Sequence, residues 1–219
     1  MSRTFTLVDS LALGDLHVYL GRAARVDDGS VRLIGGSGVL AVYVSVLHPN
    51  GLLDESPTVL GLRTFALADT TTTFDAVVPA RQLLDRLALL SVTVNFDDGP
   101  IGVMLPPAES SPAWVGISPP RGGWVPLGDV PSSVLETAAR EGVAEVAAAL
   151  PTDSGEQLVH RVRTEVWGRP IPDVVPSLPA GIGLAADSLG FLRTDEPAKI
   201  FSSGPWSRVT TRRGHVLAR

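Results

Sequence analysis

Residues 118–124 read Ser-Pro-Pro-Arg-Gly-Gly-Trp, and this stretch divides the 219-residue chain into two halves of different character. Two prolines and two glycines prevent the stretch from being helix or strand along its whole length. The sequence before it is rich in strand-like runs, and the sequence after it is rich in helical patterns. We therefore predict an α+β protein with a sheet-based domain at 1–117, a connector at 118–130 and a helical domain at 131–219.

The composition predicts a folded, soluble protein of the cytoplasm. Hydrophobic residues make up 44% of the chain and charged residues 19%, a balance typical of globular domains. The absence of cysteine excludes disulfides, thiolate metal sites and cysteine nucleophiles. The first residues lack the pattern of a signal peptide, and no apolar run has the length of a membrane span. Arginine outnumbers lysine 17 to 1, which is typical of a GC-rich genome.

The first half begins with a helix and a buried hairpin. Asp9 is placed to cap a helix over residues 11–26, whose leucines share one face. Ser30–Ile34 is predicted to be a short strand, and Gly35–Gly38 a turn. Val39–Leu47 is apolar on both faces, which favours a central strand.

The rest of the first half predicts more strands and a second helix. Thr58–Leu67 is rich in β-formers, and Thr70–Thr73 is expected to be a loop. A helix is expected to open at Val77-Val78-Pro79 and to reach about Leu90. Residues 92–96 alternate in polarity and are expected to pair with Ile101–Leu105 as a hairpin. The domain is therefore predicted to be a mainly antiparallel sheet with one or two covering helices.

The second half predicts three helices followed by a β-meander. Ser133 with Glu136, and Ser154 with Gln157, have the spacing of capping boxes. The predicted helices cover residues 134–149, a segment ending at about Trp167, and Ala180–Leu189; the predicted strands cover residues 198–201, 206–211 and 215–217. Three helices followed by a hairpin is the element order of a winged helix, and we expect that resemblance.

Several familiar chemistries are disfavoured. The four histidines are far apart in the sequence, so no protein-bound metal is expected. Ser37 lacks the Gly-x-Ser-x-Gly spacing of a nucleophile elbow. Gly181–Ala186 matches a dinucleotide-binding pattern but follows prolines rather than a strand, which favours a small-residue helix packed closely on a neighbour. No cofactor is predicted, and the chain is expected not to be an enzyme, although the sequence leaves this open.

The C-terminal segment is basic. Residues 197–219 carry five basic residues and no acidic one. Its candidates for contact with phosphate or with an acidic partner are Arg208, Arg212, Arg213 and His215. The helix that would enter a DNA groove, Ala180–Leu189, has none of the side chains that read bases in pairs, so sequence-specific DNA binding is disfavoured. Nonspecific phosphate contact stays open, as does pairing with the acidic residues of 131–196, which we favour.

The connector supplies the other candidate site. Arg121, between a proline and two glycines, is well presented to bind a carboxylate or a phosphate, and Trp114 and Trp124 are candidates for a stacking wall. The structural alternative, which we favour, is that both tryptophans pack between the halves while Arg121 bonds loop carbonyls.

Four stretches resemble a group of uncharacterised actinobacterial proteins: RAARVDDGSVRL at 22–33, TVLGLR at 58–63, SPPRGGW at 118–124 and RRGHVLAR at 212–219. The resemblance implies a bacterial, cytoplasmic protein and brings no activity or site with it.

The sequence as a whole favours a non-catalytic binding or protein-interaction module that acts as a homodimer or in a protein complex. The first alternative is an enzyme or small-anion binder that uses Arg121 near Trp124. The second is a nucleic-acid accessory protein that contacts phosphates through the basic C-terminal hairpin. No membrane association is expected.

Overall fold

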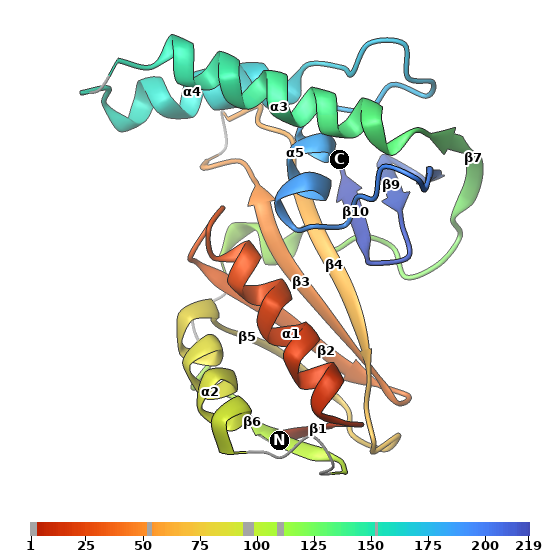
Figure 1. Ribbon diagram of the computed structural model, residues 1–219. Coiled ribbons are helices and arrows are strands. Elements are labelled where there is room, and N and C mark those ends of the chain that lie inside the picture. Colours follow the sequence, from red (N-terminus) through yellow and green to blue (C-terminus); the bar gives the residue numbers. More distant parts are fainter. Residues whose placement is uncertain (1–3, 52–53, 94–98, 109–111, 152) are drawn as a thin grey trace. The chain divides into compact units, whose positions relative to one another are not determined.

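The computed structural model of the protein describes most of the chain (Figure 1). The described residues are 4–51, 54–93, 99–108, 112–151 and 153–219.

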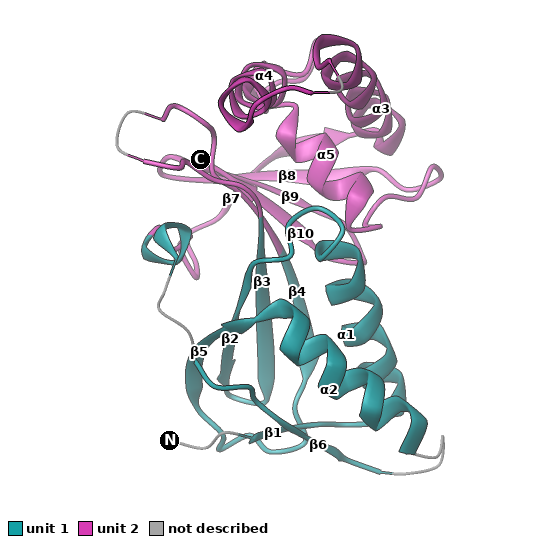
Figure 2. Cartoon of the chain, turned by 90° about the vertical axis from the view of Figure 1, so that its left-hand side faces the viewer, with its two compact units in different colours: residues 1–45, 62–116 teal, residues 46–61, 117–219 magenta. Residues whose placement is uncertain are grey.

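Two compact units make up the fold (Figure 2). Unit 1 comprises residues 1–45 and 62–116, and unit 2 comprises residues 46–61 and 117–219. Across the described residues the secondary structure is α+β, with five α-helices and antiparallel strand pairing, as predicted. No helix in those ranges is both long and apolar enough to cross a membrane.

In unit 1, strands β2 to β5 separate the two α-helices along the chain. Its helices α1 and α2 lie side by side against one face of its strands (Figure 2). The elements that begin in unit 1 or run through it are β1 (Thr4–Leu7), α1 (Ser10–Ala23), β2 (Ser30–Gly36), β3 (Val39–Leu47), β4 (Val59–Ala66), β5 (Phe74–Pro79), α2 (Ala80–Thr93), β6 (Ile101–Met104) and the short 3-10 helix η1 (Ala113–Gly116).

The predicted start of unit 1 is confirmed. The side chain of Asp9 accepts a hydrogen bond from the backbone N–H of Ala12 at 2.7 Å and caps α1. Strands β2 and β3 pair antiparallel, with Gly36 opposite Val39. The two residues between them, Ser37 and Gly38, have φ values of 51° and 77°, as a two-residue hairpin turn requires. Strand β3 lies between β2 and β4 and is largely buried, as its apolar sequence predicts.

The prediction for residues 70–105 is partly wrong. Val77 and Val78 lie in β5, which pairs with β2, and the helix begins only after Pro79. Helix α2 continues to Thr93, so the start of the predicted strand at 92–96 is helical; the remainder of that strand lies in 94–98, outside the described residues. The alternation of polarity that begins at Val92 does not reflect a strand there. Val92 lies at the end of α2, and its side chain is 80% exposed rather than packed against a sheet. Strand β6 pairs with β1 instead, in a two-stranded sheet.

Unit 2 places one strand before its helices and three after them. Its described elements are β7 (Val125–Val130), α3 (Ser132–Ala149), α4 (Glu156–Gly168), α5 (Gly181–Ser188), β8 (Ala198–Ser203), β9 (Trp206–Thr210) and β10 (His215–Ala218). The four strands follow the order β10-β9-β8-β7, and every neighbouring pair is antiparallel. The predicted C-terminal meander is therefore confirmed.

The predicted winged-helix resemblance is wrong. Strand β7 precedes the helices and pairs with β8, whereas the prediction began with three helices. Thr58, the residue before β4, and Arg219, the residue after β10, exchange two backbone hydrogen bonds of 3.0 Å. The start of β4 therefore lies beside β10, at the edge of the strand layer opposite β7. The capping boxes are also absent from the described chain: Pro131 and Gly155 hold the N-cap positions of α3 and α4 without side-chain caps.

Small residues allow α5 to pack closely against α3, as predicted for Gly181–Ala186. All residues from Gly181 to Ala186 are buried. A Cβ built on Gly183 would lie 2.7 Å from the carbonyl oxygen of Leu135 in α3, a distance that real Cβ atoms do not show. The close helix approach, rather than a phosphate, therefore accounts for this glycine.

We predict that Gly183→Ala lowers the free energy of unfolding by about 1–3 kcal/mol, because the new methyl group meets backbone that cannot rotate away. Urea denaturation measures the change. The matched control is Gly14→Ala in α1, where a Cβ would meet nothing within 4 Å; this change is expected to stabilise the protein by up to about 1 kcal/mol. An unaltered stability of Gly183→Ala would contradict the close packing of α3 and α5.

Candidate functional site

An arginine in contact with two aromatic rings is the most unusual feature of unit 2. The guanidinium carbon of Arg208 on β9 lies 4.5 Å from the ring centroid of Trp124 and 4.5 Å from that of Phe201. Phe201 on β8 is the cross-strand partner of Arg208. Cross-strand neighbours face the same side of a sheet, so the strand register supplies one ring. The connector supplies the other ring.

Hydrogen bonds fix the connector beside this arginine. The indole N–H of Trp124 donates to the carbonyl oxygen of Pro120 at 3.2 Å. The hydroxyl of Ser203, at the end of β8, donates to the carbonyl oxygen of Gly122 at 3.4 Å. Gly123 has a φ of 74°, which a residue with a side chain rarely adopts. The two prolines and two glycines of residues 118–124 therefore form a turn that presents Trp124.

Arg208 has no anionic partner among the residues that the structure describes. Its Nε atom is buried and forms no hydrogen bond there, and no carboxylate of those residues lies within ion-pair distance. Burial lowers the pKa of this guanidinium from its usual value. Cation–π contacts compensate part of the lost hydration, but they supply no counter-charge.

The positive charge of Arg208 also affects His215 on β10. Its Nδ1 atom lies 3.0 Å from the hydroxyl oxygen of Thr210, its cross-strand partner. Burial, followed by the positive charge of Arg208, lowers the pKa of His215 to about 4. His215 is therefore neutral at physiological pH and is not a cation for phosphate.

In the structure, a candidate residue of the connector contacts a candidate residue of the basic C-terminal segment. Trp124 of the connector and Arg208 of the basic tail stack on each other. Arg121 is exposed in the turn, and no side-chain contact of it is found among the described residues. Trp114 is buried in η1 of unit 1, whereas Trp124 belongs to unit 2.

The remaining basic candidates differ in their surroundings. The guanidinium of Arg212 pairs with the carboxylate of Glu196 at 3.2 Å, which is the intrachain pairing with acidic residues that the sequence favoured. Arg213 is exposed in the turn between β9 and β10, where its backbone N–H donates to the hydroxyl of Thr211.

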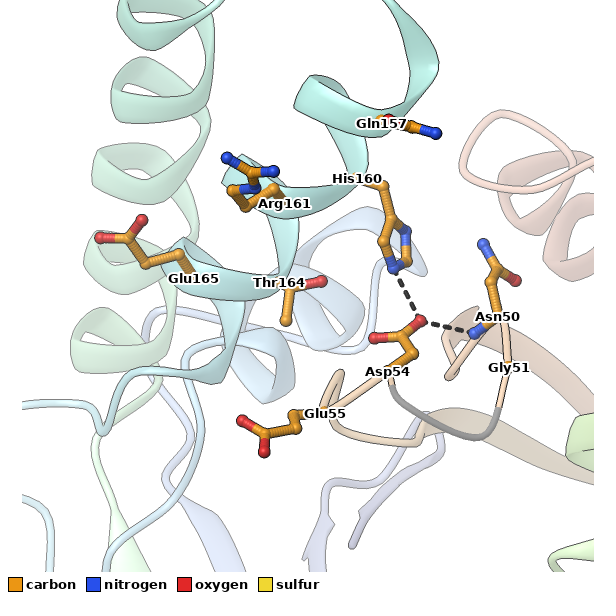
Figure 3. A pocket seen from close by; sticks show the side chains of 9 residues that line it. All are labelled: Asn50, Gly51, Asp54, Glu55, Gln157, His160, Arg161, Thr164 and Glu165. Atoms are coloured by element: carbon orange, nitrogen blue, oxygen red, sulfur yellow. Dashed lines mark hydrogen bonds and ion pairs between the residues drawn. The ribbon is translucent and has the colours of Figure 1, made fainter.

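A second polar cluster lies where the β3–β4 connection meets α4 (Figure 3). It borders an open hollow of about 1390 Å³. The residues that line this hollow come from the connection and from α4: Asn50, Gly51, Asp54, Glu55, Gln157, His160, Arg161, Thr164 and Glu165.

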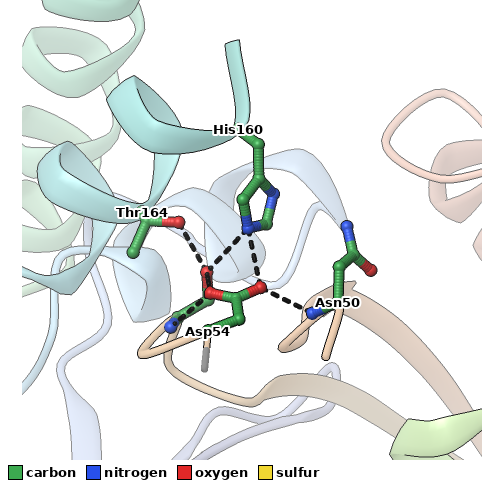
Figure 4. A network of polar contacts seen from close by, with 5 residues as sticks. Asn50, Asp54, His160 and Thr164 are labelled. Carbon is green, nitrogen blue, oxygen red and sulfur yellow. Dashed lines mark hydrogen bonds and ion pairs between the residues drawn. The ribbon is translucent and has the colours of Figure 1, made fainter. Parts of the chain in front are cut away.

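Asp54 is the centre of this cluster (Figure 4). Its carboxylate accepts hydrogen bonds from the backbone N–H groups of Asn50 and Ser56, from the hydroxyl of Ser56 at 2.7 Å, and from Nε2 of His160 at 2.7 Å. Burial raises the pKa of this carboxyl, but the hydrogen bonds outweigh burial and hold the pKa well below its usual range. The hydroxyl of Ser56 also contacts that of Thr164, so the cluster ties the β3–β4 connection to α4.

The arrangement of Ser56, His160 and Asp54 is not a catalytic triad. In a triad the acid and the serine contact different nitrogens of the histidine. Here Asp54 and Ser56 both approach Nε2, at 2.7 Å and 3.5 Å. Ser56 is 8% exposed, and its hydroxyl is already bonded to Asp54. The cluster is therefore a structural contact that sequence reasoning missed, because 106 residues separate Asp54 from His160.

The described residues contain no group of three or more histidines, aspartates or glutamates that could hold a metal ion.

Solved structures show which class of fold these elements form. A DNA polymerase III subunit beta from Pseudomonas aeruginosa matches over 99% of this chain with a TM-score of 0.52 and 17% sequence identity. A DNA polymerase sliding clamp from Caulobacter crescentus matches over 100% with a TM-score of 0.51 and 14% identity. DNA polymerase III subunit beta from Borrelia burgdorferi matches over 99% with a TM-score of 0.55 and 8% identity. The chain therefore has a fold similar to that of sliding clamps, and it spans 64–65% of their length.

The sequence family is shown as well. Residues 1–116 match the family described as "Domain of unknown function (DUF8010)", and the chain belongs to this family. Residues 119–219 match a second one, "Domain of unknown function (DUF8185)". No curated protein matches the sequence. The predicted membership of an uncharacterised group is confirmed, and its actinobacterial origin stays a prediction.

We predict that His215 titrates near pH 4, which NMR of its ring protons measures. Because the folded pKa lies below the unfolded value, the unfolded state binds the proton first as pH falls. The stability that neutral His215 contributes is complete above about pH 6.5 and decreases towards pH 4, by an amount on the order of 3 kcal/mol. Arg208→Met should raise the pKa of His215, because one of its two causes is removed. An ordinary pKa in the wild-type protein would contradict the burial described above.

Proposed function

We propose that this chain is a non-catalytic protein-interaction module built on a fold similar to that of sliding clamps. The observation that carries the proposal is the match of 98–100% of the chain to structures of sliding clamps. The sequence suggested a binding module independently, from the lack of a recognisable catalytic pattern.

The chemistry of the described residues favours binding over catalysis. The cluster that has the residue types of a triad, at Ser56, His160 and Asp54, is arranged as a structural contact. A guanidinium without a counter-charge, at Arg208, suits recognition of an anion because it brings no nucleophile or general base.

The surface of unit 1 favours a protein partner over a nucleic acid. On α1 and α2 the exposed charged residues are Asp15, Arg81 and Asp85. With the half-buried Arg22 and Arg86, the two helices carry three arginines and two aspartates, whereas binding to a nucleic-acid backbone needs a large excess of basic residues. The same helices expose Leu11 at 73% and Leu89 at 67%. Exposed apolar side chains among mixed charges are typical of protein-binding surfaces.

The basic hairpin offers little support for the nucleic-acid alternative. Arg212 is paired with Glu196, and His215 is neutral at physiological pH. Arg208 and Arg213 are the candidates without a carboxylate partner among the described residues, and two cations are fewer than the several phosphate contacts that nonspecific binding needs.

The experiment is affinity capture by the full chain from a lysate of its source organism, with and without nuclease, followed by light scattering of the purified chain. We expect a saturable protein partner, or a homodimer, that nuclease treatment does not remove. Binding of a labelled DNA duplex is expected to stay undetectable at low salt.

Two results would overturn the proposal. Capture that nuclease abolishes, together with duplex binding that weakens steeply with salt, would indicate a nucleic-acid protein. A purified monomer that captures no protein and turns over a small molecule would indicate an enzyme.

A further inference from the structure

We propose that the guanidinium of Arg208, in contact with the rings of Trp124 and Phe201, binds a carboxylate of an acidic segment in a protein partner. This inference rests on the proposed function and names the chemistry of the partner. The site is formed by residues 120–124 of the connector together with β8 and β9.

The site is preorganised. Two aromatic rings lie against the guanidinium of Arg208, each with its centroid 4.5 Å from Cζ, and they restrict its movement. The Trp124 ring is itself fixed by its hydrogen bond to Pro120. Binding therefore needs little further ordering of the long arginine side chain, whose entropy otherwise opposes a surface ion pair.

Arg208 lacks a counter-charge among the described residues. Its side chain is half-buried, and its Nε is the only side-chain nitrogen or oxygen of those residues that is both buried and without a hydrogen bond. The two terminal nitrogens are not among such buried atoms and form no ion pair there. These terminal nitrogens form the edge that binds both oxygens of a carboxylate. A cation that has already lost part of its hydration gains more from an anion than a fully hydrated one does.

The surrounding residues favour one modest anion over a polyanion. Lys199 lies two positions before Phe201 on β8, which places both on the same face of the sheet. Asp129 on β7 is the cross-strand partner of Lys199 and offsets its charge. The chain as a whole carries a net charge of −5, which opposes a nucleic-acid strand. Glutamate or aspartate in a protein segment fits this balance.

Arg121 gives the site a second contact. It lies between two residues whose carbonyl oxygens are fixed, Pro120 by Trp124 and Gly122 by Ser203. The backbone of Arg121 is therefore fixed three residues before Trp124, and its side chain is exposed. An acidic segment with more than one carboxylate can engage Arg208 first and Arg121 second.

The test uses the full chain and a capped peptide of alternating glutamate and glycine. The reporter is the indole N–H signal of Trp124 in NMR spectra, with the signals of Trp114 and Trp167 as internal references. We expect saturable shifts of the Trp124 signal with a dissociation constant on the order of 1 mM, which is typical of one or two charge pairs. The same peptide with glutamine in place of glutamate is expected to cause no shift.

Two variants make the test specific. Arg208→Lys keeps the charge but loses the planar fork, and it should weaken peptide binding by about 5-fold or more. Arg213→Lys is the matched control, because Arg213 lies exposed in the adjacent turn, and it should stay within about 2-fold of the wild-type protein. Near-UV circular dichroism confirms that each variant keeps its tertiary packing. If Arg208→Lys fails to fold, Arg121→Gln replaces it, with an expected loss of about 4-fold or more, outside the range of the control.

Equal binding by wild type and Arg208→Lys, or equal binding of the two peptides, would overturn the inference. So would the absence of shifts at about 10 mM peptide, and so would shifts caused by a single-stranded oligonucleotide but not by the peptide. If the peptide fails while nuclease-resistant protein capture persists, the proposed function stands and the partner binds elsewhere.

Discussion

The charge of Arg208 is the constraint on which the interpretation of unit 2 depends. Moving a guanidinium partly out of water is costly, and the protein compensates with two aromatic rings rather than with a carboxylate. Two neighbours of Arg208 are affected. The turn of residues 120–124 fixes Trp124 beside it, and burial together with the charge of Arg208 keeps His215 neutral. A partly buried cation without a carboxylate partner among the described residues is typical of a functional site.

Strands β3 and β4 each have residues in both units. Strands β3 and β4 lie partly in unit 1, while residues 46–61, at their adjoining ends, belong to unit 2. Within unit 2, Asp54 ties the connection between these strands to α4, and Thr58 pairs with the C-terminal Arg219. The Asp54 cluster therefore has a structural role in unit 2, which explains why residues of catalytic types gather there without catalytic geometry.

Local sequence signals predicted much of the fold. Asp9, the turn at Ser37 and Gly38, and the C-terminal meander were found because a cap, a hairpin turn and alternating strands are encoded by neighbouring residues. Strand β5 was missed because Val77 and Val78 precede a helix directly, and β7 was missed because all of its residues except Val130 are exposed. These strands are defined by partners far away in the sequence.

The candidate site was predictable only in its parts. Trp124 and Arg208 were each selected as candidates from the sequence. Their contact could not be predicted, because 83 residues lie between them in the chain. The strand register that sets Phe201 beside Arg208 could have been suggested by the meander, since the turn between β8 and β9 fixes which residues face each other. No local signal indicates that Arg208 has no acid beside it, because that depends on the packing of unit 2.

The central claim is that Arg208 is an open receptor for a carboxylate, and the nitrogen signals of its own side chain test it most directly. In arginine-labelled protein near pH 7, the Arg208 Nε–H signal should shift saturably when the glutamate peptide is added, while that of Arg213 stays in place. A saturated shift at Arg208 that disappears with the glutamine peptide would agree with the account. An Arg208 signal that does not move while the peptide is bound would contradict it.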